Sequence, residues 1–130
     1  MPESKLYLAK AREALREGRA ELGIGLAQAA ARASYLAAFH AAQALIFERS
    51  GKVARTHRGV HGQFLRLSGG DARLFDLPEF LSRAYNFKAV ADYAIDPGAS
   101  MSLEQARSAI QTASRFVESV AAVIDNGEEK

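Results

Sequence analysis

Apolar residues recur along this chain at steps of three and four, which is the spacing of one face of an α helix. The first stripe consists of Leu8, Ala11, Leu15, Gly18 and Leu22. Gly23 and Gly25 follow it and predict a break. Residues 26–49 are alanine-rich and apolar almost all round, which indicates a buried central helix that ends at Ser50 and Gly51.

The second half of the chain shows shorter helical segments and one long one. Thr56 can cap a short helix that ends at 68–70, and Asp71 can cap the segment after it, in which Pro78 begins a fresh helix. Residues 96–98 are a turn signal, and residues 102–105 form a capping box. The clearest core-facing stripe comes last and consists of Leu103, Ala106, Ile110, Ala113, Val117, Val120 and Ile124.

No segment alternates apolar and polar residues over the length that a strand needs. The sequence therefore predicts an all-α fold, an up-and-down bundle of four to five helices in one domain over residues 1–130. We expect the last helix to pack against the alanine-rich one.

Composition removes several classes of function. The 130 residues include no cysteine, which excludes disulfides, cysteine-based zinc sites and thiol nucleophiles. The N-terminal residues run into a charged helical pattern without the apolar core of a signal peptide, and no uncharged run approaches the roughly 20 residues that span a bilayer. We expect a soluble cytoplasmic protein with no membrane contact.

The net charge of +2 conceals an asymmetry between the two halves of the chain. Residues 1–70 hold eleven Lys/Arg against five Asp/Glu, and residues 71–130 hold six against ten. From 49 to 66 every charged residue is basic. Such a run favours a phosphate-bearing partner, an acidic protein surface, or simply solvent.

The central helix carries polar residues that a core helix could have avoided. Arg32 lies among apolar neighbours, so we expect it to be paired or to face a cleft, since an unpaired buried charge is costly. Asp92, on a later helix, is a candidate partner, and Arg32 is also a candidate binding residue. His40 is typical of a hydrogen-bonded core histidine.

The stretch RTHRGVH, residues 55–61, supplies four further candidate binding residues, Arg55, His57, Arg58 and His61. They surround a predicted helix start, where backbone N–H groups can bind phosphate and Gly59 would permit close approach. An ordinary capped loop is the alternative. His57 and His61 share a helix face, as in zinc proteases, but the glutamate of that motif is replaced by Arg58 and no third ligand is evident, so we expect no metal and no cofactor.

Three segments together resemble the small stand-alone HEPN proteins of prokaryotes. They are RASYLAAFHAAQALIFERSGKVARTHRGVHGQFLRL, RAYNFKAVADYAI and MSLEQARSAIQTASRFVESV, and they cover about residues 32–120. The resemblance implies a helical bundle, a homodimer, and a partner of the minimal nucleotidyltransferase type in a toxin–antitoxin-like pair. It also implies an association with RNA or nucleotide.

Many members of that family are metal-independent ribonucleases with an arginine followed, four to six residues later, by a histidine. Here Lys88 takes the arginine position, and Asp92 and Tyr93 take the histidine position. Arg55 and His61 satisfy the spacing too, but on another helix, which we interpret as coincidence. Lysine lacks the bidentate fork of arginine, and aspartate is a weak base.

Three hypotheses for function follow. The first is a nucleotide- or RNA-associated module with a nucleotidyltransferase-type partner. The second is an active ribonuclease with Lys88, Asp92 and Tyr93 as its catalytic residues, or alternatively with Arg55 and His61. The third is a structural interaction module, in which a buried Arg32–Asp92 pair specifies the packing and its loss destabilises the fold strongly.

Overall fold

The computed structural model describes residues 2–93 and 101–128, and within them not the side chains of Val90, Ala91, Tyr93 and Glu128. All regular structure in these residues is helical, which confirms the predicted all-α class. The predicted turn at residues 96–98 lies outside the described residues. The elements are α1 (Pro2–Gly23), α2 (Ala27–Ser50), α3 (His57–Ser68), the 3₁₀ turn η1 (Ala72–Leu74), α4 (Leu77–Tyr93) and α5 (Leu103–Glu128).

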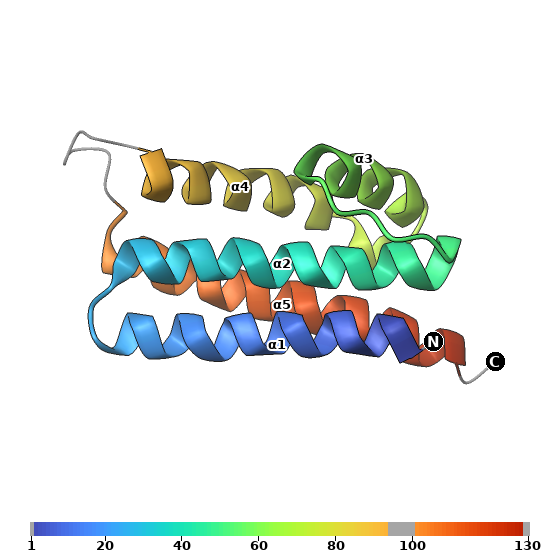
Figure 1. Ribbon diagram of the computed structural model, residues 1–130, viewed down its shortest axis with the longest axis horizontal. Helices are drawn as coiled ribbons and strands as arrows, with labels where there is room; N and C mark the ends of the chain where they lie inside the picture. The colour runs from blue at the N-terminus through green and yellow to red at the C-terminus, as the bar shows by residue number, and fades with distance from the viewer. Residues whose placement is uncertain (1, 94–100, 129–130) are drawn as a thin grey trace.

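Four long helices, α1, α2, α4 and α5, lie side by side and alternate in direction (Figure 1). The alanine-rich α2 is central and contacts all four other α helices. The short α3 lies beside the C-terminal half of α2 and the start of α4 (Figure 1). No described helix has the length and hydropathy needed to span a bilayer.

The predicted stripes face the core. Every member of the α5 stripe is buried except Leu103, which is 43% exposed because it stands in the first turn. On α1, Gly18 marks the closest approach of three helices. A Cβ atom there would lie 3.0 Å from Ala33 Cβ on α2 and 2.5 Å from Ile110 Cδ1 on α5. Small residues on α1 and α2 therefore set how closely the bundle packs.

The helix ends follow the predicted signals. Thr56 Oγ1 accepts a hydrogen bond from the Gly59 N–H at 2.9 Å, which starts α3. Ser102 and Gln105 form the reciprocal capping box of α5, with hydrogen bonds of 2.9 and 3.0 Å. Gly51 ends α2 with φ of 71°, a left-handed backbone that suits glycine.

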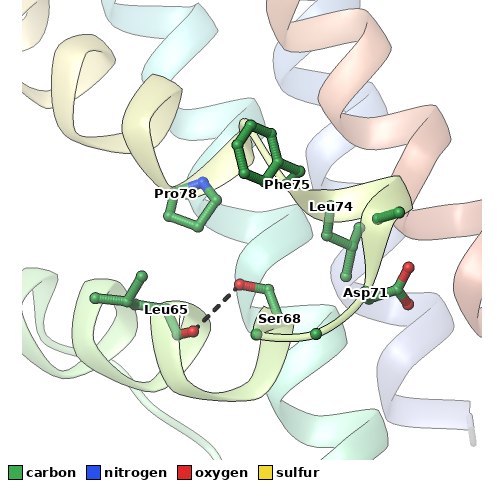
Figure 2. Close-up of a pocket in the computed structure, with 9 residues that line it drawn as sticks. Leu65, Ser68, Asp71, Leu74, Phe75 and Pro78 are labelled. Atoms are coloured by element: carbon green, nitrogen blue, oxygen red, sulfur yellow. Dashed lines mark hydrogen bonds between the residues drawn. The ribbon is translucent and has the colours of Figure 1, made fainter.

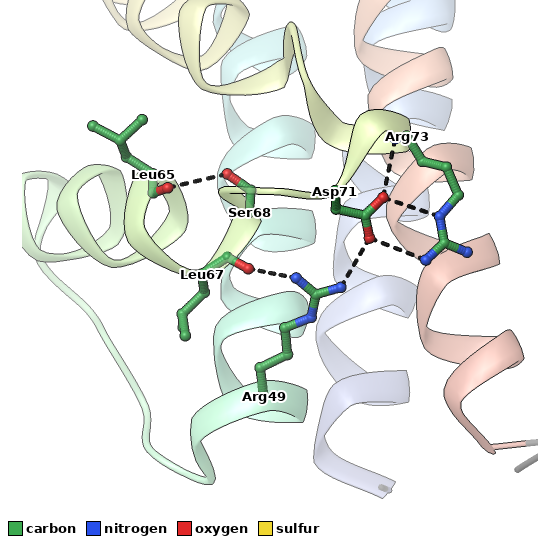
Figure 3. Close-up of polar contacts among 6 residues, drawn as sticks. All are labelled: Arg49, Leu65, Leu67, Ser68, Asp71 and Arg73. Atoms are coloured by element: carbon green, nitrogen blue, oxygen red, sulfur yellow. Dashed lines mark hydrogen bonds and ion pairs between the residues drawn. The ribbon is translucent and has the colours of Figure 1, made fainter.

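An ionic clasp, formed by Arg49, Asp71 and Arg73, joins the ends of three elements (Figure 3). Arg49 donates to the Leu67 carbonyl near the end of α3 and to Asp71 Oδ2 at 3.1 Å. Arg73 holds both carboxylate oxygens of Asp71, at 3.1 and 3.0 Å, while Asp71 also accepts from the Arg73 backbone N–H and so caps η1. Hydrogen bonds from the two arginines, those of Arg73 foremost, lower the pKa of Asp71 to about 2.

A second polar contact fixes the linker between α2 and α3. Gln43 is buried, and its Nε2 donates to the Ala54 carbonyl at 2.9 Å. Its Oε1 accepts from His40 Nδ1 at 2.8 Å, so His40 is the hydrogen-bonded, partly buried histidine that the sequence indicates. The linker is thereby held against α2, and this places Arg55 and Thr56 at the start of α3.

Candidate functional site

His57 and His61, the two histidines of the RTHRGVH stretch, both contact the hydroxyl group of one buried tyrosine. Tyr35, in the middle of α2, is completely buried. Its Oη lies 2.6 Å from His57 Nδ1 and 3.0 Å from His61 Nε2. Because His57 and His61 are four residues apart on α3, both rings face α2 from the same side of the helix.

A tyrosine hydroxyl carries a single hydrogen, so it can donate to only one of two imidazoles. The other imidazole must then donate its own N–H to the tyrosine oxygen. The two separations fit either assignment, so one imidazole accepts the Tyr35 O–H hydrogen and the other donates its N–H hydrogen to the Tyr35 oxygen.

Aromatic rings lie against this trio. Tyr85 of α4 lies with its ring centroid 5.0 Å from that of His57 and 5.7 Å from that of His61, edge-on to the latter. The ring centroid of Phe39 on α2 lies 5.3 Å from that of His57. Rings from both α2 and α4 thus pack against the imidazoles of α3.

The pKa of each group of the trio is shifted in the direction that favours its neutral form, although His57 is exposed and His61 only half-buried. Desolvation lowers the pKa of His57, and the ammonium group of Lys88 lowers it further. Desolvation, followed by the neighbouring His57, lowers the pKa of His61. The pKa of the Tyr35 hydroxyl is raised strongly by burial and then by Tyr85.

The second cluster is Lys88, Asp92 and Arg32. Lys88 Nζ lies 2.5 Å from Asp92 Oδ2, and Arg32 Nε lies 3.5 Å from Asp92 Oδ1. The hydrogen bond from Lys88, and then the charges of Lys88 and Arg32, lower the pKa of Asp92. Asp92 is therefore an anion at neutral pH that holds Lys88 and accepts no proton there.

The predicted ion pair between Arg32 and Asp92 is confirmed, but the prediction that the pair is buried is wrong. The side chain of Arg32 is 56% exposed. The sequence indicates an apolar environment for Arg32. Its position lies near the start of α2, on the side of the helix that faces solvent. An exposed ion pair of this kind adds little stability. Loss of the Arg32–Asp92 pair should therefore not cause the strong destabilisation that the structural hypothesis predicts.

Lys88 connects the two clusters. It stands three residues after Tyr85 on α4, and its charge acts on His57 of α3. Lys88 on α4 therefore lies near enough to His57 on α3 for its charge to act on the imidazole. The side chain of Tyr93, the remaining predicted catalytic residue, lies outside the described residues.

Arg55 and Arg58 are exposed beside His57 at the start of α3. In the described part of the chain neither has a carboxylate partner. The sequence predicts that Gly59 permits the close approach of a phosphate, but the structure gives it another role. A Cβ atom at this position would lie 2.7 Å from Thr56 Oγ1, so the missing side chain makes room for the helix cap.

The described residues contain no cluster of three His, Cys, Asp or Glu side chains able to hold a metal ion. Sequence reasoning placed His57 and His61 on one helix face but missed the partners, Tyr35 and Tyr85. Tyr35 did carry a signal, because a tyrosine inside so apolar a helix must bury its hydroxyl and needs a hydrogen-bond partner. Tyr85 had none.

Two cavities of about 290 Å³ each flank α3 without containing any predicted site residue. One lies between the end of α3 and the start of α4, where Phe75 at its rim is 87% exposed and Leu65 lies across from it (Figure 2). The other lies under the α2–α3 linker and is lined by Lys52 and Arg66, two more cations without a carboxylate partner among the described residues.

The model of the HEPN domain family matches residues 4–123. No curated protein matches the chain. The family match covers α2 to α4 completely and most of α1 and α5, so it includes both clusters.

Proposed function

Because this chain belongs to the HEPN family, we propose that it is an RNA-associated module that binds the sugar–phosphate backbone across α3 and α4 and cleaves it without a metal. The observation that carries the proposal is that two imidazoles contact one tyrosine hydroxyl group and that the charge of Lys88 acts on one of them. Imidazoles that are neutral near pH 7 can exchange protons with a hydroxyl group, and a nearby cation can stabilise a phosphate.

The charge pattern supports a polyanionic partner. Cations that lack a carboxylate partner in the described part of the chain follow the linker and α3, namely Lys52, Arg55, Arg58 and Arg66. Charges left unpaired on a protein surface bind phosphates through the release of counterions. Their spread along more than one turn of α3 suits an extended strand better than a single small anion.

Within this proposal, Lys88 neutralises the phosphate that is cleaved. Asp92 positions Lys88 through their hydrogen bond, and Arg32 adds a second cation beside the carboxylate. Tyr93 remains a candidate on the family resemblance alone. Lysine in place of arginine retains the charge but not the bidentate contact, so we expect a weaker hold on the phosphate than arginine would give.

We also propose, from the family, that the protein is one half of a toxin–antitoxin-like pair with a nucleotidyltransferase-type partner. A homodimeric state and a cytoplasmic location belong to the same proposal. Co-purification with a co-expressed small nucleotidyltransferase would test the pairing, and sedimentation of the purified chain would test the dimer.

RNA binding is the first test. The anisotropy of a labelled single-stranded RNA should rise on binding, and the affinity should fall steeply with salt. In the double variant Arg55→Ala/Arg58→Ala, the slope of log K against log salt should decrease by about 1.4, since each lost contact to a single strand removes about 0.7.

The matched control is Arg12→Ala/Arg19→Ala, which removes the same charge from α1, on the side of α2 away from α3 (Figure 1). It should bind as the wild type does. Equal slopes in both double variants would contradict the proposed surface. Cleavage in EDTA should be lost in Lys88→Ala, and cleavage that needs an added metal ion would contradict the proposed chemistry.

A further inference from the structure

We propose that His61, Tyr35 and His57 form a proton relay, in which His61 takes the proton of an RNA 2′-hydroxyl, His57 delivers a proton to the leaving 5′ oxygen, and the Tyr35 hydroxyl links the two. The inference rests on the proposed function, since it assigns catalytic residues to the cleavage. These residues lie on α2 and α3, away from the α4 positions that the sequence resemblance indicates.

The two hydrogen bonds of Tyr35 carry the assignment, because they link both imidazoles through one hydroxyl group. The proposed relay starts with His61 as donor to Tyr35 and Tyr35 as donor to His57, so that the chain of donors points one way. The outer nitrogens are then His61 Nδ1, with a free lone pair, and His57 Nε2, with a hydrogen. In the described residues no protein group hydrogen-bonds to either outer nitrogen. One imidazole is thus prepared as a base and the other as an acid.

The proton steps balance without any net charge on the trio. His61 Nδ1 accepts the 2′-hydroxyl proton while the 2′ oxygen bonds to phosphorus. His61 passes its Nε2 proton to Tyr35 Oη, Tyr35 passes its own to His57 Nδ1, and His57 releases its Nε2 proton to the 5′ oxygen as the phosphorus–oxygen bond breaks. The products are a 2′,3′-cyclic phosphate and a free 5′-hydroxyl.

After this step the donor chain points the other way, so His57 has the free lone pair and His61 the outer hydrogen. Hydrolysis of the cyclic phosphate needs this reversed arrangement, because water now enters where the 5′ oxygen left. His57 accepts the water proton, and His61 returns a proton to the 2′ oxygen. The second step therefore restores the starting state.

The surroundings favour a relay over two independent imidazoles. An independent pair needs one charged imidazole, and burial, Lys88 and the mutual proximity of the two rings oppose that charge. In the described part of the chain, the charged and titratable groups beside the trio are Lys88 and Tyr85 of α4 and the exposed Arg55 and Arg58. None of these side chains is a carboxylate that could stabilise an imidazolium ion.

The test is the pH dependence of RNA cleavage in EDTA, in the wild type and in Tyr35→Phe. With the relay both imidazoles must be neutral, so the wild-type rate should rise with pH and then stay level above about pH 7. Tyr35→Phe leaves two independent imidazoles, one of which must be charged. Its rate should pass through a maximum and then fall about tenfold per pH unit. Its RNA affinity should equal that of the wild type.

Tyr7→Phe is the matched control, because it removes a hydroxyl from α1 while the ring stays packed against the core. Its profile should follow the wild type. The same level profile in Tyr35→Phe as in the wild type would overturn the relay and leave the proposed function standing. A wild type that binds RNA without cleaving it would overturn both the relay and the cleavage in the proposed function, whereas a wild type that binds no RNA would overturn the proposed function entirely.

Two further measurements use the wild type alone, and the first of them needs no RNA. The Tyr35 hydroxyl proton should appear in the NMR spectrum as a slowly exchanging signal close to the His57 ring, while the Tyr7 hydroxyl proton exchanges rapidly. A Tyr35 proton that exchanges as fast as that of Tyr7 would overturn the relay. In solvent mixtures of H₂O and D₂O, the wild-type cleavage rate should depend on the deuterium fraction along a curve, and a straight line would overturn it too.

Discussion

At the residue scale, one buried hydroxyl organises the site. Tyr35 is completely buried and would lose free energy without hydrogen bonds, and the two imidazoles of α3 supply them. In return the imidazoles are fixed in orientation and held away from water on one side. The same contact therefore stabilises α3 against α2 and keeps both histidines uncharged at neutral pH.

This arrangement predicts how stability depends on pH. The pKa values of His40, His57 and His61 are all lowered in the folded state, by burial first in each case. The unfolded chain, with histidine pKa values near 6.5, takes up protons first as the pH falls. Urea unfolding should therefore show full stability above about pH 6.5 and a loss as the pH falls through the folded pKa values.

The variants His40→Gln, His57→Gln and His61→Gln should each reduce this pH dependence. Most carboxylates titrate lower, so a comparison between about pH 7.5 and pH 5 isolates the histidines. A free energy of unfolding that is constant or increases over this interval on acidification would contradict the prediction.

At the scale of elements, the ionic clasp positions α3 and α4. Asp71 connects the C-terminal end of α2 with η1, and its side chain is only 14% exposed. Because α3 is short and makes fewer contacts than the long helices, its end depends on the Arg49 contact to the Leu67 carbonyl.

Asp71→Ala should lower the free energy of unfolding by roughly 1–2 kcal/mol, because it removes both a helix cap and two ion pairs. Asp71→Asn should cost less, since asparagine still caps. Asp76→Asn is the control, because its pair with Arg115 is half exposed on both sides. Equal unfolding midpoints for Asp71→Ala and Asp76→Asn would contradict this role.

The clasp also has its own pH window. The pKa of Asp71 is lowered to about 2 in the folded state, against about 3.9 in the unfolded chain. Its contribution is therefore complete above about pH 3.9 and is lost as the pH falls toward 2. This window lies well below that of the histidines, so acid unfolding can separate the two.

At the scale of the whole molecule, the bundle depends on close helix packing around α2. Gly18→Val should lower the free energy of unfolding by roughly 1–3 kcal/mol, because the new side chain meets Ala33 and Ile110. Gly23→Val is the control, since a Cβ atom at that position meets nothing within 4 Å. Thermal or urea unfolding would measure both, and equal midpoints would show that α1 can shift without cost.

The sequence by itself determined the helices, their ends and their buried faces. Thr56, Gly51 and the Ser102–Gln105 box act within one turn of the chain, and the stripe periodicity follows from helix geometry alone. The HEPN resemblance, carried by motif order and spacing, is confirmed by the family match over residues 4–123.

Only the tertiary structure decided which side chains meet. A helical pattern states that His57 and His61 share a face, but not that the face opposes Tyr35, because contacts between helices depend on crossing angles and rotations that no local pattern contains. The sequence identified Asp92 as the partner of Arg32. It did not show that the Arg32 side chain is exposed, because exposure also depends on how the helices pack. Helix-to-helix packing brought Tyr35, Tyr85 and the charge of Lys88 to the two histidines, and the candidate chemistry of this protein follows from that placement.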